Sequence, residues 1–332
     1  MADQFFIKGL SGKRELSGKI RVTGAKNAVL KSFAASLLFD DVVVVSNVPD
    51  IEDVSRVREL LGDLGATVAE TASGTYAITT SGVSKSDLDD AVARRLRASI
   101  VFAGPLLARF GRVSFPHPGG DIIGPRPINF FLEGFEKMGG KVSFKNDRYT
   151  VTARGGLRGA EIFFMFITVT GTETLMLAAT LAKGTTVLKN AAMEPEIVAL
   201  ADFLNACGAR ITGAGTPTIT IEGGGMLRAN GKTLRTIPDR IEAGSFLLLG
   251  ALCADNLEIT DCNPEHIEIL IRLLRESGMS VTAGENSVSI RSSTTPQFKA
   301  LRVRTHEYPG FATDLQPPMT VYLTQADGES TV

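Results

Sequence analysis

The residues from Pro116 to Pro127 have the composition of a shaped loop around one acid. They include four prolines and three glycines, which excludes a helix or a regular strand and leaves glycine points about which the loop can move. Asp121 is the carboxylate of this stretch and a candidate general acid. Arg126 stands just before Pro127, a favoured first residue for the helix predicted over 128–138. This arrangement predicts a lid over an anionic substrate, and an ordinary surface connection is the alternative.

Cations stand at the predicted starts of three helices: Lys26, Arg97 and Arg126. A helix start carries about half a positive charge, so a cation there costs about 0.3–1 kcal/mol but suits a bound anion. Each position alone is more often structural, whereas three together favour a phosphate or diphosphate site. The Gly24-Ala25-Lys26-Asn27 stretch lacks the spacing of a P-loop, and the chain has no convincing dinucleotide-binding GxGxxG pattern.

Two further helix starts carry polar groups. The stretch from Thr168 to Thr172 offers hydroxyls and backbone N–H groups, which form either a diphosphate cradle or a helix cap. Asp314 begins the last predicted helix, where capping is the structural alternative to a role in chemistry.

One pattern returns four times along the chain. A run with helical periodicity ends at a glycine and is followed by two short alternating strands. The marker glycines are Gly65, Gly139, Gly208 and Gly278, spaced by 74, 69 and 70 residues. Each is predicted to end its helix in the left-handed conformation. Four copies in register indicate an internal repeat of about 70 residues.

A second set of helices is apolar on nearly every face and is therefore predicted to be buried. We expect these helices over 27–39, 98–110, 173–182, 243–254 and 315–326. The helices that start at Ile51, Ile128, Glu196 and Glu265 carry charges on one side and should face solvent. Ordinary doubly wound folds place their helices outside a sheet. The pattern instead predicts an α/β fold with clustered helices inside and short four-stranded sheets outside.

Composition narrows the classes of function. A length of 332 residues favours two domains. The 35 Lys and Arg residues nearly balance the 36 Asp and Glu residues, and this lack of a strong net charge predicts no nucleic-acid partner. Three cysteines without a CxxC pair favour free thiols, and three scattered histidines give no metal-ligand spacing. The N-terminus lacks a signal-peptide pattern, and no apolar run reaches the roughly 20 residues of a membrane span. We therefore expect a cytoplasmic protein without membrane insertion.

An ordered set of motifs resembles the enolpyruvyl transferases that act on UDP-N-acetylglucosamine, the UDP-N-acetylglucosamine 1-carboxyvinyltransferases. The Gly24–Asn27 match alone is less specific, because the related shikimate-pathway enolpyruvyl transferase shares the fold, so the specificity lies in the whole set. The motifs run along essentially all of the chain: Ser17–Ile20, Thr23–Ala28, Arg97–Ser99, Pro118–Pro127, Asn190–Ile197, Pro238–Glu242 and Thr313–Gln316.

The resemblance implies an EPSP synthase-like fold of two domains, each an inside-out α/β barrel of three repeats, that close over the substrates. Residues 26–235 would form one complete domain. Residues 1–25 with 236–332 would form the other, without its last one and a half repeats, because six repeats of about 70 residues need about 420. On this basis we expect a C-terminally truncated member of the family.

The implied reaction moves the enolpyruvyl group of phosphoenolpyruvate onto the 3-hydroxyl of UDP-N-acetylglucosamine and releases phosphate. This is the first committed step of peptidoglycan synthesis, and it uses no cofactor or metal. The resemblance implies catalytic roles for Lys26, for Asp121, which protonates the methylene carbon, and for Asp314, which assists deprotonation of the sugar hydroxyl. The implied substrate contacts are Lys26, Asn27, Arg97, Arg126, Pro127, Ile128, Asn129, Phe130, Phe166, Ile167, Thr168, Val169 and Asp314.

Two positions depart from the usual family pattern. Asp121 stands where many members carry cysteine, which predicts resistance to epoxide inhibitors that alkylate that thiol. Phe166 stands where many relatives have lysine, in an unusually apolar segment, which weakens one nucleotide contact. Two alternatives stay open: a truncated, non-catalytic remnant that binds the nucleotide sugar, and a shikimate-type enolpyruvyl transferase.

Overall fold

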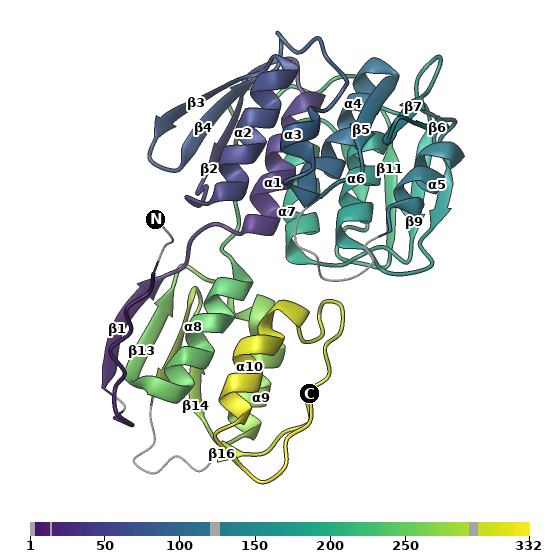
Figure 1. Cartoon of the computed structure of the whole chain (residues 1–332). Helices are drawn as coiled ribbons and strands as arrows, with labels where there is room; N and C mark the ends of the chain where they lie inside the picture. Colours follow the sequence, from purple (N-terminus) through teal and green to yellow (C-terminus); the bar gives the residue numbers. More distant parts are fainter. Residues whose placement is uncertain (1–3, 14, 120–126, 292–297) are drawn as a thin grey trace. The chain divides into compact units, whose positions relative to one another are not determined.

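The chain folds into two compact units. The computed structural model describes residues 4–13, 15–119, 127–291 and 298–332. The contiguous unit spans Gly24–Ile237, and the composite unit joins Met1–Thr23 to Pro238–Val332. The two segments of the composite unit are tied together by parallel pairing of β1 (Leu16–Arg21) with β13 (Ala254–Thr260), as Figure 1 shows.

Helices and short strands alternate along the contiguous unit (Figure 1). In chain order its elements are α1 (Lys26–Ala35), η1 (Ser36–Leu38), β2 (Val43–Ser46), α2 (Glu52–Leu64), β3 (Thr67–Ala72), β4 (Thr75–Thr79), α3 (Asp90–Ala93), η2 (Arg97–Phe102), α4 (Ala103–Phe110), β5 (Arg112–Pro116), α5 (Asn129–Lys137), β6 (Lys141–Lys145), β7 (Arg148–Thr152), β8 (Glu161–Phe163), α6 (Val169–Thr180), β9 (Thr185–Lys189), α7 (Pro195–Ala206), β10 (Arg210–Thr212), β11 (Thr218–Glu222) and β12 (Thr233–Arg235).

The composite unit places its helices against one sheet (Figure 1). After β1, its elements are α8 (Arg240–Cys253), β13, η3 (Pro264–Ile267), α9 (Glu268–Glu276), β14 (Ser280–Ala283), β15 (Ser287–Arg291), β16 (Phe298–Lys299), η4 (Thr313–Leu315), α10 (Gln316–Leu323) and β17 (Ala326–Asp327).

Three sheets share one pattern of strand pairing, in which one parallel pair is followed by two antiparallel pairs. The strand orders are β12-β2-β4-β3, β8-β9-β11-β10 and β1-β13-β15-β14. The sheet β5-β7-β6 has both antiparallel pairs, and an isolated parallel bridge from Asp87 to Ser114 stands where its fourth strand would lie. This mixture of helices with short mixed sheets confirms the α/β class predicted from the sequence.

The four marker glycines end their helices as predicted. Gly65, Gly139, Gly208 and Gly278 follow α2, α5, α7 and α9, and their φ angles lie between 90° and 104°. A side chain is strained in this left-handed conformation, whereas glycine adopts it freely. These glycines therefore turn the chain from each helix into the strand that follows.

Two of the predicted apolar helices are buried on nearly all sides. Every residue of α6 from Gly171 to Thr180 is buried, and so is every residue of α1 from Ala28 to Ala35. Helix α6 begins four residues earlier than expected because Thr168 caps it. In the composite unit burial is less complete, since Leu249 of α8 and Val321 of α10 are exposed.

The expectation that the helix at Glu196 faces solvent is wrong for its first turn. Pro195, Glu196 and Ile197 of α7 are all buried. The reason is tertiary packing, because α7 packs against both α1 and α6. Helical periodicity alone had placed Glu196 on the solvent-facing side of its helix.

A pair of glycines in two helices of the contiguous unit allows a stability test of this packing. A Cβ on Gly104 of α4 would lie 2.3 Å from the carbonyl oxygen of Thr174 on α6, whereas a Cβ on Gly62 of α2 would meet nothing within 4 Å. We expect Gly104→Ala to lower the free energy of unfolding by about 1–3 kcal/mol. Gly62→Ala should raise it by about 0.5–1 kcal/mol because alanine favours the helix. Urea denaturation measures both, and equal effects of the two changes would contradict the close approach of α4 and α6.

Candidate active site

The start of α1 presents Lys26 and Asn27 as its first two residues. The chain reaches it through Gly24, where a Cβ would lie 1.8 Å from the carbonyl oxygen of Asn47, so only glycine fits. The Lys26 side chain is about half exposed, and its Nζ lies 3.6 Å from Oδ2 of Asp53. A half-exposed cation thus lies beside the positive end of a helix whose remaining turns are buried.

The start of η2 carries Arg97, which is half-buried. Its guanidinium donates a hydrogen bond to the carbonyl oxygen of Pro118, at 3.2 Å. Gly119 follows, and a Cβ there would lie 1.4 Å from the carbonyl oxygen of Arg94. The described beginning of the proline- and glycine-rich stretch is therefore fixed beside Arg97. Asp121 and Arg126 lie outside the described residues.

The start of α5 lies beside the start of α6. Pro127 is exposed, Ile128 is buried, and Asn129 is the exposed first residue of α5. The half-buried Phe130 ring comes so close to Gly171 that a Cβ on this glycine would lie 3.2 Å from it. Glycine at this position lets the two helix starts approach each other.

The start of α6 is capped by its own sequence. The hydroxyl oxygen of Thr168 accepts a hydrogen bond from the backbone N–H of Gly171 at 3.1 Å, and Val169 is the first helical residue. This geometry confirms the helix-cap reading of the stretch, while the N–H groups of Val169 and Thr170 stay in the first turn, where a helix offers donors to an anion. Ile167, Thr168 and Val169 are all half-buried.

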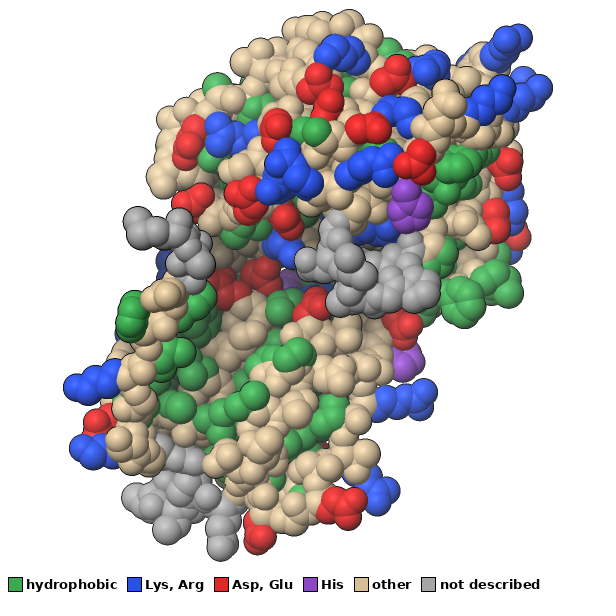
Figure 2. Space-filling model, in the orientation of Figure 1, with side chains coloured by type: hydrophobic (Ala, Val, Ile, Leu, Met, Phe, Trp, Pro, Cys, Tyr) green, Lys and Arg blue, Asp and Glu red, His purple; other side chains and the backbone are tan. Residues whose placement is uncertain are grey.

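An apolar surface precedes this capped start. Phe166 is 83% exposed, and Phe163 and Met165 are exposed beside it in sequence. None of these three side chains carries a positive charge next to the start of α6. This is the departure from the family pattern that the sequence showed at Phe166. Elsewhere on the face in view, basic and acidic side chains are mixed (Figure 2).

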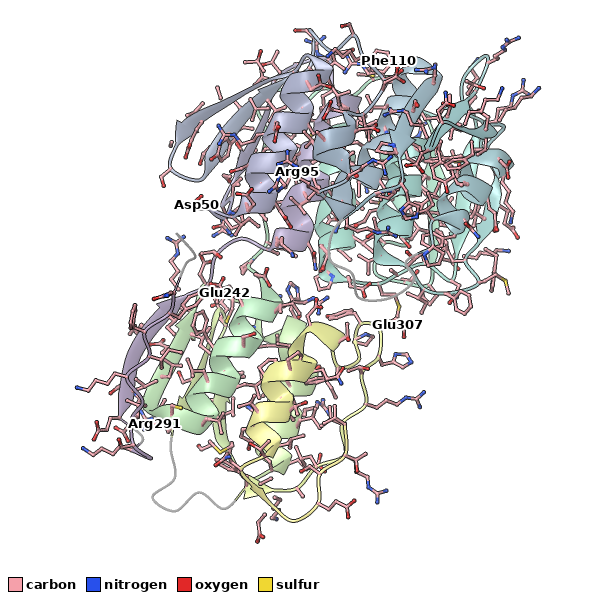
Figure 3. The ribbon with its side chains drawn as sticks, in the orientation of Figure 1. Asp50, Arg95, Phe110, Glu242, Arg291 and Glu307 are labelled. Carbon is pink, nitrogen blue, oxygen red and sulfur yellow. The ribbon has the colours of Figure 1, made fainter. Side chains whose placement is uncertain are left out.

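Asp314 belongs to the composite unit. It lies in the short helix η4 and is exposed, and the residue that precedes η4 is Ala312, so Asp314 does not cap this helix. The nearby helix α8 is fixed by other acids of the same unit. Asp239 caps it, and Glu242 in its first turn accepts hydrogen bonds from the backbone N–H and hydroxyl of Thr23 (Figure 3).

Sequence reasoning missed a buried ion pair below the helix starts. Nζ of Lys31 on α1 lies 3.1 Å from Oε2 of Glu173 on α6, and the two side chains are 6% and 0% exposed. Glu194 and Glu196, at the start of α7, are also buried. Charged residues inside otherwise apolar helical runs were the available signal, but the sequence does not show that they face one another.

The pKa of Glu173 reflects this burial. Removal of the carboxylate from water is the largest effect and raises its pKa from 4.5 to about 8, with Glu196 and Glu194 adding to the rise and Lys31 opposing it. Oε1 of Glu173 makes no hydrogen bond within the described part of the chain. Desolvation therefore outweighs the ion pair, and Glu173 holds a proton near neutral pH.

The ion pair joins α1 to α6. Lys31 is the sixth of the ten residues of α1, and Glu173 is the fifth of the twelve residues of α6. Phe130 adds the start of α5, and packing of η2 against both α1 and α6 adds Arg97. These contacts link the elements that carry most of the described candidate residues, all within the contiguous unit, whereas Asp314 lies in the other unit.

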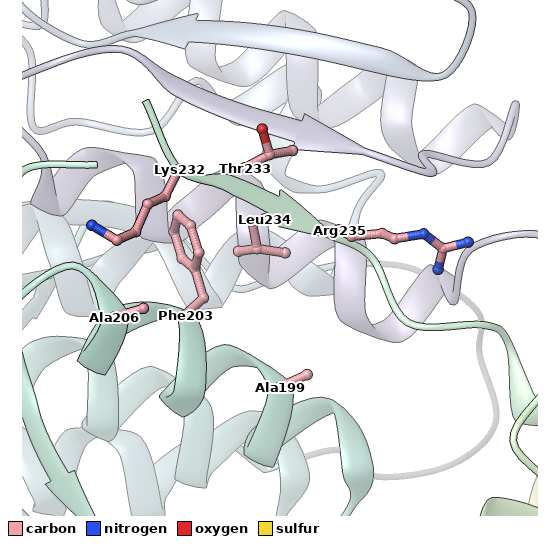
Figure 4. Close-up of a pocket in the computed structure, with 7 residues that line it drawn as sticks. All are labelled: Ala199, Phe203, Ala206, Lys232, Thr233, Leu234 and Arg235. Atoms are coloured by element: carbon pink, nitrogen blue, oxygen red, sulfur yellow. The ribbon is translucent and has the colours of Figure 1, made fainter. Parts of the chain in front are cut away.

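A cavity of about 450 Å³ lies apart from these residues, between α7 and β12 (Figure 4). Phe203 and Leu234 form part of its lining, and Lys232 and Arg235 extend toward opposite ends. No residue predicted from the sequence lines it. Among the described residues no cluster of three or more His, Cys, Asp or Glu side chains is suited to a metal ion. Nor does this part of the chain contain a helix with the length and apolarity that a membrane crossing requires.

The raised pKa of Glu173 makes stability depend on pH. The folded state binds the proton more tightly than the unfolded state, so this contribution is complete below about 4.5 and is lost as the pH rises toward about 8. We expect the free energy of unfolding of the wild type to fall across this window relative to Glu173→Gln, by at most about 1.4 kcal/mol per pH unit. Urea titrations at several pH values measure this difference, and parallel curves for the two proteins would refute it.

The comparison with sequence families covers nearly the whole chain. Residues 10–332 match the family described as EPSP synthase (3-phosphoshikimate 1-carboxyvinyltransferase). The UDP-N-acetylglucosamine 1-carboxyvinyltransferase of Desulforapulum autotrophicum is 43% identical over 331 residues, which cover 99% of this chain and 77% of that protein. The UDP-N-acetylglucosamine 1-carboxyvinyltransferase 2 of Streptococcus pyogenes serotype M18 is 40% identical, over 97% of this chain and 76% of that protein.

Solved structures show the same fold at lower identity. The enolpyruvyl transferase NikO from Streptomyces tendae matches with a TM-score of 0.82 at 22% identity, over 96% of this chain and 75% of that one. An EPSP synthase from Acinetobacter baumannii matches with a TM-score of 0.69 at 17% identity, over 96% of this chain and 74% of that one. These matches confirm the EPSP synthase-like fold and the resemblance found in the sequence. The chain belongs to the EPSP synthase family of enolpyruvyl transferases, and its relatives at about 40% identity are UDP-N-acetylglucosamine 1-carboxyvinyltransferases.

Proposed function

We propose that this protein transfers the enolpyruvyl group of phosphoenolpyruvate to the 3-hydroxyl of UDP-N-acetylglucosamine. The observation that carries the proposal is the 43% identity to such a transferase over 99% of the chain. The positions of Lys26 and Arg97 at helix starts, and the capped start of α6, support it. Helix dipoles, backbone N–H groups and cations then act together on the phosphates of both substrates.

The proposed chemistry is addition followed by elimination. The sugar 3-hydroxyl oxygen bonds to the carbon that bears the phosphate, its proton leaves with help from Asp314, and the methylene carbon gains a proton from Asp121. Loss of that methyl proton and of phosphate then restores the double bond. Lys26 and Asn27 would hold phosphoenolpyruvate together with Arg126. Arg97, the 127–130 segment and the 166–169 segment would hold the nucleotide sugar.

The repeat organisation of the fold is also a proposal. We infer repeats of about 70 residues arranged as inside-out barrels. The strand pairing shared by three sheets and the four equivalent glycines support this inference. Completeness of the 26–235 domain, absence of one and a half repeats from the other, and a cytoplasmic location stay predictions.

Two alternative functions predict different results in an activity assay. The chain spans 77% of its relative from Desulforapulum autotrophicum, so a remnant that binds the nucleotide sugar without turnover is one of them. A shikimate-type transferase is the other, and the description of the matching family includes that activity.

Phosphate release from phosphoenolpyruvate and UDP-N-acetylglucosamine tests the function directly. We would compare the 332-residue chain with a version extended by one and a half family repeats. Release by either form supports the proposed reaction. Release with shikimate 3-phosphate in place of the nucleotide sugar supports the second alternative. Binding of the nucleotide sugar without release by either form supports the remnant.

The lysine at the start of α1 has a matched control. Lys26 and Lys85 are 55% and 58% exposed, and each lies within 4 Å of an aspartate. We expect Lys26→Met to lower kcat/KM for phosphate release by roughly 100-fold or more, because it removes the positive charge that stabilises the phosphate as it leaves. Lys85→Met should stay within about twofold of wild type. A Lys26→Met enzyme with unchanged kcat/KM would remove Lys26 from the site.

The acid at position 121 predicts how the protein responds to an epoxide that alkylates thiols. We expect the wild type to keep its activity and mass, because a carboxylate is a poorer nucleophile than a thiolate. Asp121→Cys should gain one adduct and lose activity. Burial raises the pKa of the Cys207 and Cys262 thiols, which keeps them protonated and unreactive. Mass spectrometry reads out the adduct, and inactivation of the wild type with an adduct in the site would contradict the prediction.

A further inference from the structure

A group of buried charged residues in the contiguous unit comes from three different helices. Lys31 comes from α1, Glu173 from α6, and Glu194 and Glu196 from the start of α7. Among the described residues, these are the charged groups that act on Glu173. All four side chains are nearly inaccessible to water. An ion pair in such a place adds little to stability compared with apolar side chains, so its presence needs another reason.

The position of the pair suggests that reason. Lys31 lies just over one helical turn from Lys26 and Asn27, and Glu173 lies one turn from Thr168 and Val169. A second contact joins the same elements, since the hydroxyl oxygen of Thr172 accepts a hydrogen bond from the backbone N–H of Ala192 at 3.1 Å. The Lys31 ammonium group and the Glu173 carboxyl, 3.1 Å apart, form a directional contact that fixes the separation of the two helices at this point. Above the pKa of Glu173, about 8, the opposite charges strengthen this contact in the low-dielectric core.

We propose that Lys31 and Glu173 are positioning residues, which fix the starts of α1 and α6 relative to each other for substrate binding. Glu196 and Glu194, at the start of α7, act on Glu173 by like-charge repulsion. The proposal rests on the proposed function in one respect, because the bound molecules are the phosphate-bearing substrates named above. The mechanical part, a fixed spacing of two helix starts, stands on the geometry alone.

The main test replaces both charges with side chains of similar volume. Lys31→Met with Glu173→Met leaves no unpaired charge from this pair, so the double variant is expected to fold. Two matched controls remove buried hydroxyls from the same helices, Ser32→Ala and Thr180→Val, where each hydroxyl bonds only within its own helix. Amide hydrogen exchange on all proteins, without substrate, reports the first turns of α1 and α6.

We expect at least about tenfold faster exchange in both first turns of the double variant, and less than about threefold change in either control. KM for both substrates should rise about tenfold in the double variant, with a smaller effect on kcat. Unchanged exchange in the double variant overturns the positioning proposal whatever the activity. Absence of phosphate release by both the 332-residue chain and the extended version overturns the proposed function and leaves the exchange result to decide the positioning role.

A second variant guards against misfolding and tests the charge itself. Glu173→Gln keeps the shape of the side chain, and near pH 6 the wild-type carboxyl is also neutral because burial raises its pKa. We expect the two proteins to have the same KM at pH 6 and to differ at least threefold at pH 9, where only the wild type forms the ion pair. A ratio that does not change with pH overturns the role of charge, because loss of shape alone would act equally at both pH values.

Discussion

Burial of α1 and α6 along nearly their whole length is the constraint on which the site depends. A helix enclosed in an apolar core has satisfied its internal backbone groups, so only its ends can offer hydrogen bonds or charge. The ion pair joins the two helices within four to five residues of their first residues, Lys26 and Val169. Glycine at position 104 lets α4 approach α6, and glycine at position 24 lets the chain pass close to Asn47 before α1 begins.

The larger sheets are built alike. Three of them share one order of parallel and antiparallel pairing, and four contain a strand that follows a helix-ending glycine in the left-handed conformation. The strands of these four sheets are three to seven residues long, and such strands can pack apolar side chains on one face while the other face meets water. Structures that are only 17–22% identical keep the same fold, which fits a design where core volume matters more than particular side chains.

The buried charged residues are the exception in this otherwise apolar core. An acid and a base enclosed between α1 and α6, with two more acids at the start of α7, cost desolvation energy that apolar residues avoid. Their location below the helix starts, rather than at the far ends of the same helices, connects this cost with the binding end of the unit. The segment before α6 shows the opposite arrangement. There the apolar side chains of Phe163, Met165 and Phe166 are exposed to water.

The sequence by itself determined the four glycines that end helices, the burial of α1 and α6, the α/β class and the ordered motifs of the family. It did so because glycine conformation and helical amphipathicity are local properties. It placed Lys26, Arg97 and Thr168 at helix starts for the same reason. Only the tertiary structure decided that Lys31 faces Glu173 and that Glu196 is buried, although a solvent-facing helix was expected there. Such contacts depend on how helices far apart in sequence pack, and no local pattern carries that information.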